Sequence, residues 1–262
     1  IYRLPLDTLR ARWPHAARVL QAWTQSEAGI IVADAETPAD LWRLARLITR
    51  EGLLDVMVGS AGLALTLSRM LSWRRGPLGR LAPAKHPILV VVGSANPTSL
   101  AQIALLEKRD ATSIIRAEIR EILAGMERFR KELDRVLTTA LAVTRAGRDV
   151  VVTPAQESDG RRDPRFPRAS ARRTRVRPLP PSASGTLSEF LGRAARDLSR
   201  KTRLGGLVLC GGDIAVATCR ALGADGIILA GEVQPGVPWG RLVGGERHDL
   251  PVVTKAGGFG RP

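Results

Sequence analysis

Residues 206–223 read GLVLCGGDIAVATCRALG, and this stretch decides the fold. The apolar run GLVLC predicts one buried strand, which stops at the pair Gly211 and Gly212. Glycine has no Cβ, so the backbone of such a turn can approach a ligand closely. The run that follows predicts a helix beginning at Asp213 and Ile214, whose first N–H groups suit a phosphate.

Two further glycine-rich turns follow predicted strands. The strand Ile88–Val92 runs into Gly93 and Ser94, and a closing strand over residues 251–254 runs into the sequence KAGGFG, which contains Lys255 and Gly257. Three such turns predict a nucleotide phosphate site. Each one taken alone is also consistent with an ordinary strand-to-helix connection.

The side chains at these turns leave two interpretations open. Ser94 either offers its hydroxyl and N–H to a phosphate or caps a turn. Asp213 either complements the helix dipole or reaches a ligand through Mg²⁺ or a ribose hydroxyl, because a bare carboxylate repels phosphate. Lys255 either neutralises phosphate charge or is a surface cation. The loop of residues 232–240, with Trp239, is either one wall of an adenine pocket or a structured surface loop.

The charge of the chain is strongly positive and unevenly distributed. The 262 residues carry 40 Lys and Arg against 25 Asp and Glu, a formal charge of +15. Much of the excess falls between Arg161 and Arg177, within a proline-rich stretch that predicts a solvated or disordered insertion at about residues 158–184. Nucleic-acid binding through this stretch is an alternative, but no aromatic residues alternate with its arginines as base stacking requires.

The remaining composition excludes several classes of protein. No apolar run is long enough for a transmembrane helix, and the start of the chain lacks a signal-peptide layout and a Met, which suggests that it begins inside a longer protein. Cys210 and Cys219 are expected to be core thiols in a reducing cytoplasm. The three histidines are scattered, so we predict no structural metal.

The first part of the chain alternates predicted strands and helices. A strand over residues 30–33 leads to a helix that is capped by Thr37 and ends at Gly52. A second strand over residues 54–58 leads through Gly59 and Ser60 to another helix. Residues 73–87 are rich in charge, Pro and Gly, so a domain boundary is predicted there, giving units 1–85 and 86–262.

The second unit continues the alternation. We predict a long helix from Ile114 to Leu141 with Gly125 as a candidate break, a strand from residue 149, a helix over residues 186–200 and a strand over residues 226–230. The predicted fold is α/β: a Rossmann-like parallel or mixed sheet with flanking helices, in two units of which the first is incomplete. P-loop, dinucleotide-fingerprint and hydrolase-elbow motifs are absent.

Taken in order, the motifs resemble a known family. The sequences GGD at residues 211–213, PGVPW at 235–239, GG at 244–245 and KAGGFG at 255–260 resemble the nucleotide-binding C-terminal domain of the four-carbon acid sugar kinases. The sequence GSANP at residues 93–97 resembles the opening of that domain. Upstream, residues 34–37 and 58–63 resemble the end of the sugar-acid-binding N-terminal domain.

The resemblance implies ATP-dependent phosphorylation of the terminal hydroxyl of a four-carbon sugar acid, such as 3-oxo-tetronate or threonate, with ATP and Mg²⁺ in a cytoplasmic enzyme. It implies sugar-acid contacts at Gly59 and Ser60, and it assigns no catalytic residue. The implied nucleotide contacts are Gly93, Ser94, Gly211, Gly212, Asp213, Ile214, Lys255 and Gly257.

Two departures from the family pattern favour an alternative. The family has Gly-Gly-Glu-Thr where this chain has Asp213 and Ile214 after the glycine pair, and the family's first strand, with its Asp-Asp-x-Thr-Gly signature, is not in the sequence. The alternative is a catalytically impaired nucleotide-binding or regulatory module. The expected partners are a sugar acid and ATP, with no membrane, with nucleic acid disfavoured, and with a homo-oligomer left open.

Overall fold

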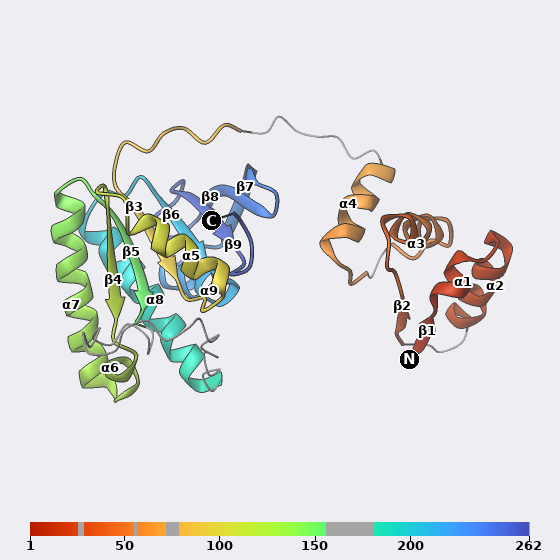
Figure 1. The fold of residues 1–262 in the computed structure, drawn as a ribbon, viewed down its shortest axis with the longest axis horizontal. Helices are drawn as coiled ribbons and strands as arrows, with labels where there is room; N and C mark the ends of the chain where they lie inside the picture. The colour runs from red at the N-terminus through yellow and green to blue at the C-terminus, as the bar shows by residue number, and fades with distance from the viewer. Residues whose placement is uncertain (26–28, 55–56, 72–78, 156–180, 262) are drawn as a thin grey trace, which may run out of the picture. The chain divides into compact units, whose positions relative to one another are not determined.

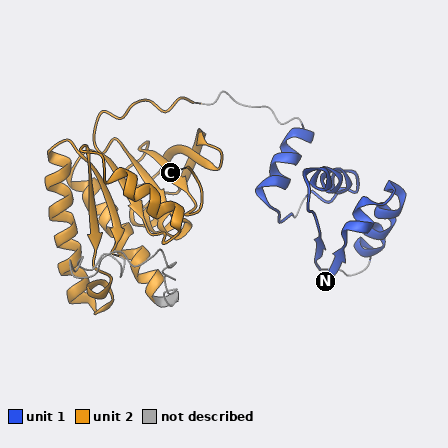
Figure 2. Cartoon of the chain, in the orientation of Figure 1, with its two compact units in different colours: residues 1–77 blue, residues 78–262 orange. Residues whose placement is uncertain are grey.

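A computed structural model describes residues 1–25, 29–54, 57–71, 79–155 and 181–261. The chain divides into two compact units, Ile1–Pro77 and Leu78–Pro262 (Figure 2). The sequence placed the division after residue 85. The division lies earlier, after Pro77, because the segment that follows it is hydrogen-bonded to the second unit. The Gly79 N–H donates to the Ala230 carbonyl at 2.8 Å, and the Gly205 N–H donates to the Pro87 carbonyl at 2.9 Å.

Unit 1 is a small α/β unit built on two short parallel strands (Figure 1). One buried cluster, including Leu4, Leu20, Leu47 and Leu67, joins the strands to all four helices. In chain order its elements are β1 (Tyr2–Leu4), α1 (Leu6–Arg10), α2 (Trp13–Thr24), β2 (Ile31–Ala33), α3 (Pro38–Arg50) and α4 (Ala61–Met70).

Helix α3 begins as the sequence predicts, at a capping box. The Thr37 side chain accepts from the Asp40 N–H, and the Asp40 carboxylate accepts from the Thr37 N–H. Asp40 is wholly buried, and Arg10 holds both carboxylate oxygens, at 2.9 and 2.8 Å. These hydrogen bonds, led by that from Arg10, hold the pKa of Asp40 well below its usual range.

Unit 2 contains a seven-stranded sheet in the order β4-β5-β3-β6-β9-β8-β7, in which β4, β5, β3, β6 and β9 are parallel (Figure 1). This mixed sheet with flanking helices confirms the predicted fold class. The elements are β3 (Ile88–Val92), α5 (Pro97–Leu106), β4 (Thr112–Ala117), α6 (Ile119–Leu123), α7 (Met126–Arg145), β5 (Asp149–Pro154), α8 (Pro181–Lys201), β6 (Gly206–Cys210), α9 (Gly212–Ala221), β7 (Gly226–Gln234), β8 (Val237–Val243) and β9 (Pro251–Lys255).

The two faces of this sheet pack against different helices. Leu89 and Val91 of β3 belong to the large cluster formed with α7, α8 and α9. Val92 is on the opposite face, in a smaller cluster with Ile103 of α5. Because side chains alternate along a strand, the apolar run of β3 can be buried on both faces.

The predicted helix over Ile114–Leu141 is wrong in its first part. Residues 112–117 form strand β4, and Ile114 and Ile115 pack into the clusters on opposite faces of the sheet. β-Branched side chains suit a strand that is buried on both faces, and their spacing also matched a helical stripe by coincidence. The break at Gly125 is confirmed: its φ of 110° precedes α7.

The predicted loop over residues 232–240 is also wrong. It belongs to the β7–β8 hairpin, whose turn holds Pro235 and Gly236, the latter with φ 78°. Pro238 lies inside β8, next to a register shift between Glu232 and Gln234 that breaks regular pairing. A Pro-Gly pair is itself a turn signal, and it could have predicted this hairpin.

Other predictions fall partly or wholly on residues that are not described. Arg161–Arg177 lies outside the described residues, as does most of the predicted insertion, whereas residues 181–184 belong to α8. Of the predicted strand over residues 54–58, residues 55 and 56 are not described and the others have no strand assignment. Among the described residues, no helix has the length and apolar character needed to cross a membrane.

Acidification is expected to weaken unit 1 through Asp40. Because the pKa of the folded carboxyl lies below the unfolded value of about 4, its contribution to stability is complete above about pH 4 and is lost as the pH falls through the folded pKa. Thermal unfolding followed by tryptophan fluorescence measures this, since Trp13, Trp23 and Trp42 lie in unit 1.

In that experiment, Asp40→Asn should lower the unfolding midpoint at pH 7 by several degrees and flatten its acid dependence. The matched control is Asp34→Asn, which removes the ion pair between Asp34 and the exposed Arg3. This substitution should change the unfolding midpoint and its acid dependence only slightly. An Asp40→Asn protein with the midpoint and acid dependence of the parent would contradict the assignment.

Candidate functional site

The three glycine-rich turns follow three adjacent strands of the sheet. Strands β3, β6 and β9 are parallel neighbours, and their last residues, Val92, Cys210 and Lys255, stand in one row of the register. The ladder extends into the turns, because the Gly93 N–H donates to the Cys210 carbonyl at 3.2 Å and the Gly211 N–H donates to the Lys255 carbonyl at 2.9 Å. Three distant parts of the sequence therefore meet at one edge of the sheet, which we call the carboxyl edge.

This edge contains a topological switch point. The connection from β3 passes through α5 toward β4, on one side of the sheet order. The connection from β6 passes through α9 toward β7, on the other side, and α5 and α9 pack on opposite faces. Chains that leave adjacent parallel strands in opposite directions open a crevice at the strand ends, where α/β proteins bind ligands.

The first and third turns contact each other closely. A Cβ on Gly257 would lie 2.0 Å from the Ser94 Oγ and 2.8 Å from the Ser94 Cβ, so only glycine fits there. The Ser94 Oγ accepts from the Asn96 N–H at 3.1 Å, so the turn-capping role of Ser94 is present. Asn96 caps α5, because its side-chain oxygen accepts from the Thr98 N–H at 2.9 Å.

The second turn opens α9 without a side-chain cap. Gly211 has φ 115°, and this cap residue makes no side-chain hydrogen bond to the first N–H groups of the helix. Ile214 is buried, and its side chain packs against the backbone of Gly93, where an added Cβ would lie 2.4 Å from the Ile214 Cδ1. Asp213 is exposed in the first helical turn. This turn therefore offers a ligand backbone N–H groups and one carboxylate, and the Ile214 side chain is used for packing.

Ser99, which the sequence did not single out as a site residue, connects α5 with the ends of β6 and β9 and with the third turn. Its buried Oγ donates to the Gly257 carbonyl at 2.7 Å, lies 3.2 Å from the Cys210 Sγ and 3.5 Å from the Lys255 Nζ. A serine hydroxyl has one proton to donate, so the thiol of Cys210 and the ammonium of Lys255 act as donors toward Ser99. The bond to Gly257 fixes the third turn. The only feature of the sequence that could have indicated this role of Ser99 is its position as a polar residue on an otherwise apolar helix face.

The predicted sugar-acid contacts lie in unit 1, at the start of α4. Ser60 caps that helix, since its Oγ accepts from the Leu63 N–H at 3.3 Å. A Cβ on the exposed Gly59 would lie 2.7 Å from the Leu63 Cδ2. Both residues therefore have a local structural role, and their proposed contact with a sugar acid stays a prediction.

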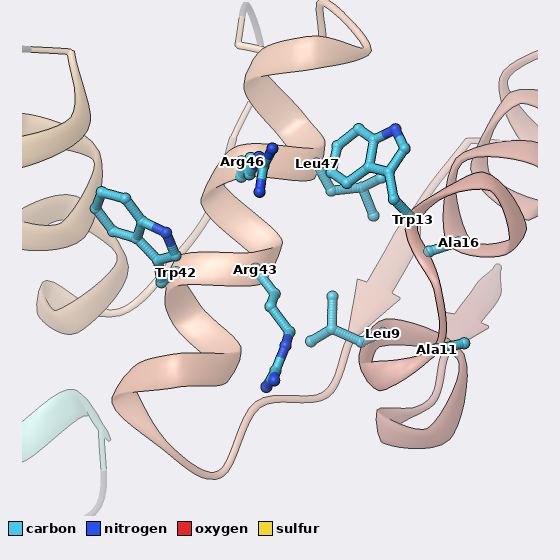
Figure 3. A pocket seen from close by; sticks show the side chains of 8 residues that line it. All are labelled: Leu9, Ala11, Trp13, Ala16, Trp42, Arg43, Arg46 and Leu47. Atoms are coloured by element: carbon cyan, nitrogen blue, oxygen red, sulfur yellow. The ribbon is translucent and has the colours of Figure 1, made fainter.

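Two surface hollows lie outside this edge or only touch it. One, of about 190 Å³, is in unit 1 between α3 and the α1–α2 segment, where Trp13, Trp42 and Arg46 line it (Figure 3). The other, of about 720 Å³, runs between α8 and α9, with Asp213 at its margin. Neither includes Ser94, Gly257 or Lys255, so neither of these two hollows is formed by the first and third turns.

Neither cysteine forms a disulfide, and no metal-binding cluster is present in the part of the chain that the structure describes. Cys210 is buried and Cys219 is half-buried, which agrees with the prediction of core thiols. Burial raises the pKa of the Cys219 thiol. No group of three His, Cys, Asp or Glu side chains among those residues is placed to hold an ion.

Known proteins resemble the chain over most of its length. Residues 89–262 match the family described as "Nucleotide-binding C-terminal domain". The chain is 30% identical over 244 residues to the D-threonate kinase of Salmonella typhimurium LT2, covering 92% of this chain and 54% of that protein. It is 35% identical over 233 residues to the D-threonate kinase of Bordetella bronchiseptica RB50, covering 89% and 50%.

A solved structure also resembles the whole chain. It is a DUF1537 protein of Bordetella bronchiseptica, a domain-swapped dimer with bound citrate, at 29% identity and a TM-score of 0.51 over 99% of this chain and 56% of that chain. The chain spans about half the length of the curated relatives it matches.

Replacing Ser99 with Ala should destabilise unit 2 by about 1 kcal/mol, because the half-buried hydrogen bond from the Ser99 hydroxyl to the Gly257 carbonyl is lost. Urea unfolding followed by circular dichroism measures this. Thr138→Ala, which removes an exposed hydroxyl from α7, is the matched control and should shift the free energy by less than about 0.5 kcal/mol. Equal stability of the Ser99→Ala protein and its parent would remove Ser99 from the framework of the site.

Proposed function

Because this chain belongs to the family of nucleotide-binding C-terminal domains, with D-threonate kinases among its relatives, we propose that it binds ATP at the carboxyl edge. The proposal extends to the whole protein, which phosphorylates the terminal hydroxyl of a four-carbon sugar acid. The observation that carries the proposal is the row of Val92, Cys210 and Lys255, which brings three glycine-rich turns to one switch point.

The phosphates would be held mainly by the backbone. The uncapped N–H groups at the start of α9 and the partial positive charge of the helix attract an anion, and Gly211 and Gly212 allow close approach. Gly257 and Ser94, which contact each other, would bind the phosphates from the opposite side. Lys255 supplies positive charge beside Ser99, and phosphoryl transfer needs such positioning and charge neutralisation.

The residues present fit Mg²⁺ carried by the nucleotide. Mg²⁺ usually keeps several waters and takes one or two carboxylates together with substrate phosphates. Asp213 is an exposed carboxylate at the start of α9 and would supply one such oxygen. When bound, the ion would screen the phosphate charge during transfer.

A sugar acid would bind to unit 1, with Gly59 and Ser60 as candidate contacts. The choice of a sugar acid follows the names of the relatives, which are D-threonate kinases. Its placement at Gly59 and Ser60 rests on the family resemblance of the sequence. A homo-oligomer and a cytoplasmic location stay predictions of the same kind.

The second candidate function is a nucleotide-binding module without phosphoryl transfer. The observation that favours it is the side chain of Ile214, which is packed against Gly93 and brings no hydroxyl to the turn. The two candidates share the nucleotide site and differ in the chemistry that follows binding.

Calorimetric titration of the full chain with ATP and Mg²⁺ tests the shared step. We expect saturable binding, and transfer of the γ-phosphate of labelled ATP to D-threonate separates the kinase from the module. Absence of saturable ATP binding at millimolar concentrations would overturn both candidates. ATP binding without transfer by the whole protein, under conditions where a D-threonate kinase relative is active, would favour the module.

Gly257→Ala should weaken ATP binding by at least tenfold, because the new methyl group and the Ser94 side chain cannot occupy the same space and the two turns must separate. The matched control is Gly147→Ala, which adds a methyl group in open space after α7 and should leave ATP binding unchanged, although its φ of 75° costs some stability. Adding Ser94→Gly to the Gly257→Ala protein removes the clash and should restore much of the affinity. If Gly257→Ala binds ATP as the parent does, the proposed role of the Ser94–Gly257 contact in phosphate binding is wrong.

A further inference from the structure

The aromatic ring of Phe259 stands beside the turn that Gly257 forms. Phe259 keeps 47% of its surface exposed, although its ring contacts the tip of the β7–β8 hairpin. A Cβ on Gly236 would lie 2.4 and 2.5 Å from two ring carbons of Phe259, so the ring rests directly on glycine backbone. The ring is therefore supported by the hairpin while much of the residue remains open to solvent.

The backbone around this ring is fixed from two elements. The Gln102 side chain of α5 donates to the carbonyls of Phe259 and Arg261, at 3.3 and 3.1 Å. The Phe259 N–H closes a turn onto the Ala256 carbonyl at 3.1 Å, and the Gln234 side chain of β7 accepts from the Arg261 N–H at 3.5 Å. An exposed ring on an anchored backbone loses little further freedom when a ligand covers it.

The Phe259 ring lies close to Gly257, which belongs to the proposed phosphate-binding turns. Only Gly258 lies between Gly257 and Phe259, so the Cα atoms of these two residues are at most about 7 Å apart. A nucleotide whose phosphates meet Gly257 and the start of α9 extends its ribose and base by a similar span. A flat apolar surface at that distance suits a purine, because aromatic rings stack on nucleobases.

We propose that Phe259 is the platform on which the purine base of the bound nucleotide stacks. The proposal rests on the proposed nucleotide site and adds a residue that determines affinity for the base rather than for the phosphates. Phe259 binds substrate without taking part in the transfer step.

The test compares ATP with inorganic tripolyphosphate, which has the phosphates and lacks the base, on the full chain with Mg²⁺ present. Phe259→Leu keeps an apolar side chain against Gly236 and removes the flat ring, so the Kd for ATP should rise about 5- to 100-fold while the Kd for tripolyphosphate stays unchanged. Phe259→Trp should bind ATP at least as well as the parent. Leu229→Ala, which shortens another exposed apolar side chain of the same hairpin, should change neither Kd.

Two results would overturn the proposal while leaving nucleotide binding intact. In the first, Phe259→Leu binds ATP as the parent does. In the second, Phe259→Leu loses affinity for ATP and for tripolyphosphate in equal proportion, which means that the ring only supports the turn. A parent chain that binds neither ligand would overturn the proposed function itself, and the base platform with it.

Discussion

The hydrogen-bonded register of β3, β6 and β9 is the constraint on which the candidate site depends. Parallel strands bond at even spacing, so aligning Val92 with Cys210 and Cys210 with Lys255 also aligns the turns that follow them. A slip of one residue would send buried side chains to the wrong face of the sheet and pull the turns apart. The apolar faces of β3 and β6 therefore fix the position of backbone groups at the carboxyl edge.

Much of this arrangement is predictable from the sequence, because glycine pairs after apolar runs have few structural interpretations. The strands at residues 88–92 and 206–210 and the helix from Gly212 follow that logic, and so does the capping box at Thr37. The contact between Ser94 and Gly257 is a tertiary contact that depends on the order of the strands in the sheet, which cannot be predicted from local sequence.

The wrong helix prediction from Ile114 has its physical origin in apolar periodicity. Ile114 and Ile115 serve both faces of a buried strand, yet with Ile119 and Ile122 they also match a helical stripe. Ser99 was missed as a site residue for a different reason: its importance comes from partners more than a hundred residues away along the chain. The hydroxyls of Ser94 and Ser60 accept from local backbone N–H groups. A serine after a glycine is therefore consistent with a structural role and with a ligand-binding role, and the sequence could not separate the two.

Strand β7 forms one edge of the large sheet and carries three exposed apolar side chains, Ile228, Leu229 and Val233. Such an edge invites pairing with strands of other molecules, which leads to aggregation. Its register shifts, between Leu229 and Gly231 and between Glu232 and Gln234, interrupt the even row of donors and acceptors that an incoming strand would need. The irregular hairpin is thus expected to disfavour strand-to-strand pairing through this edge, and a β7 with regular register would be more prone to it.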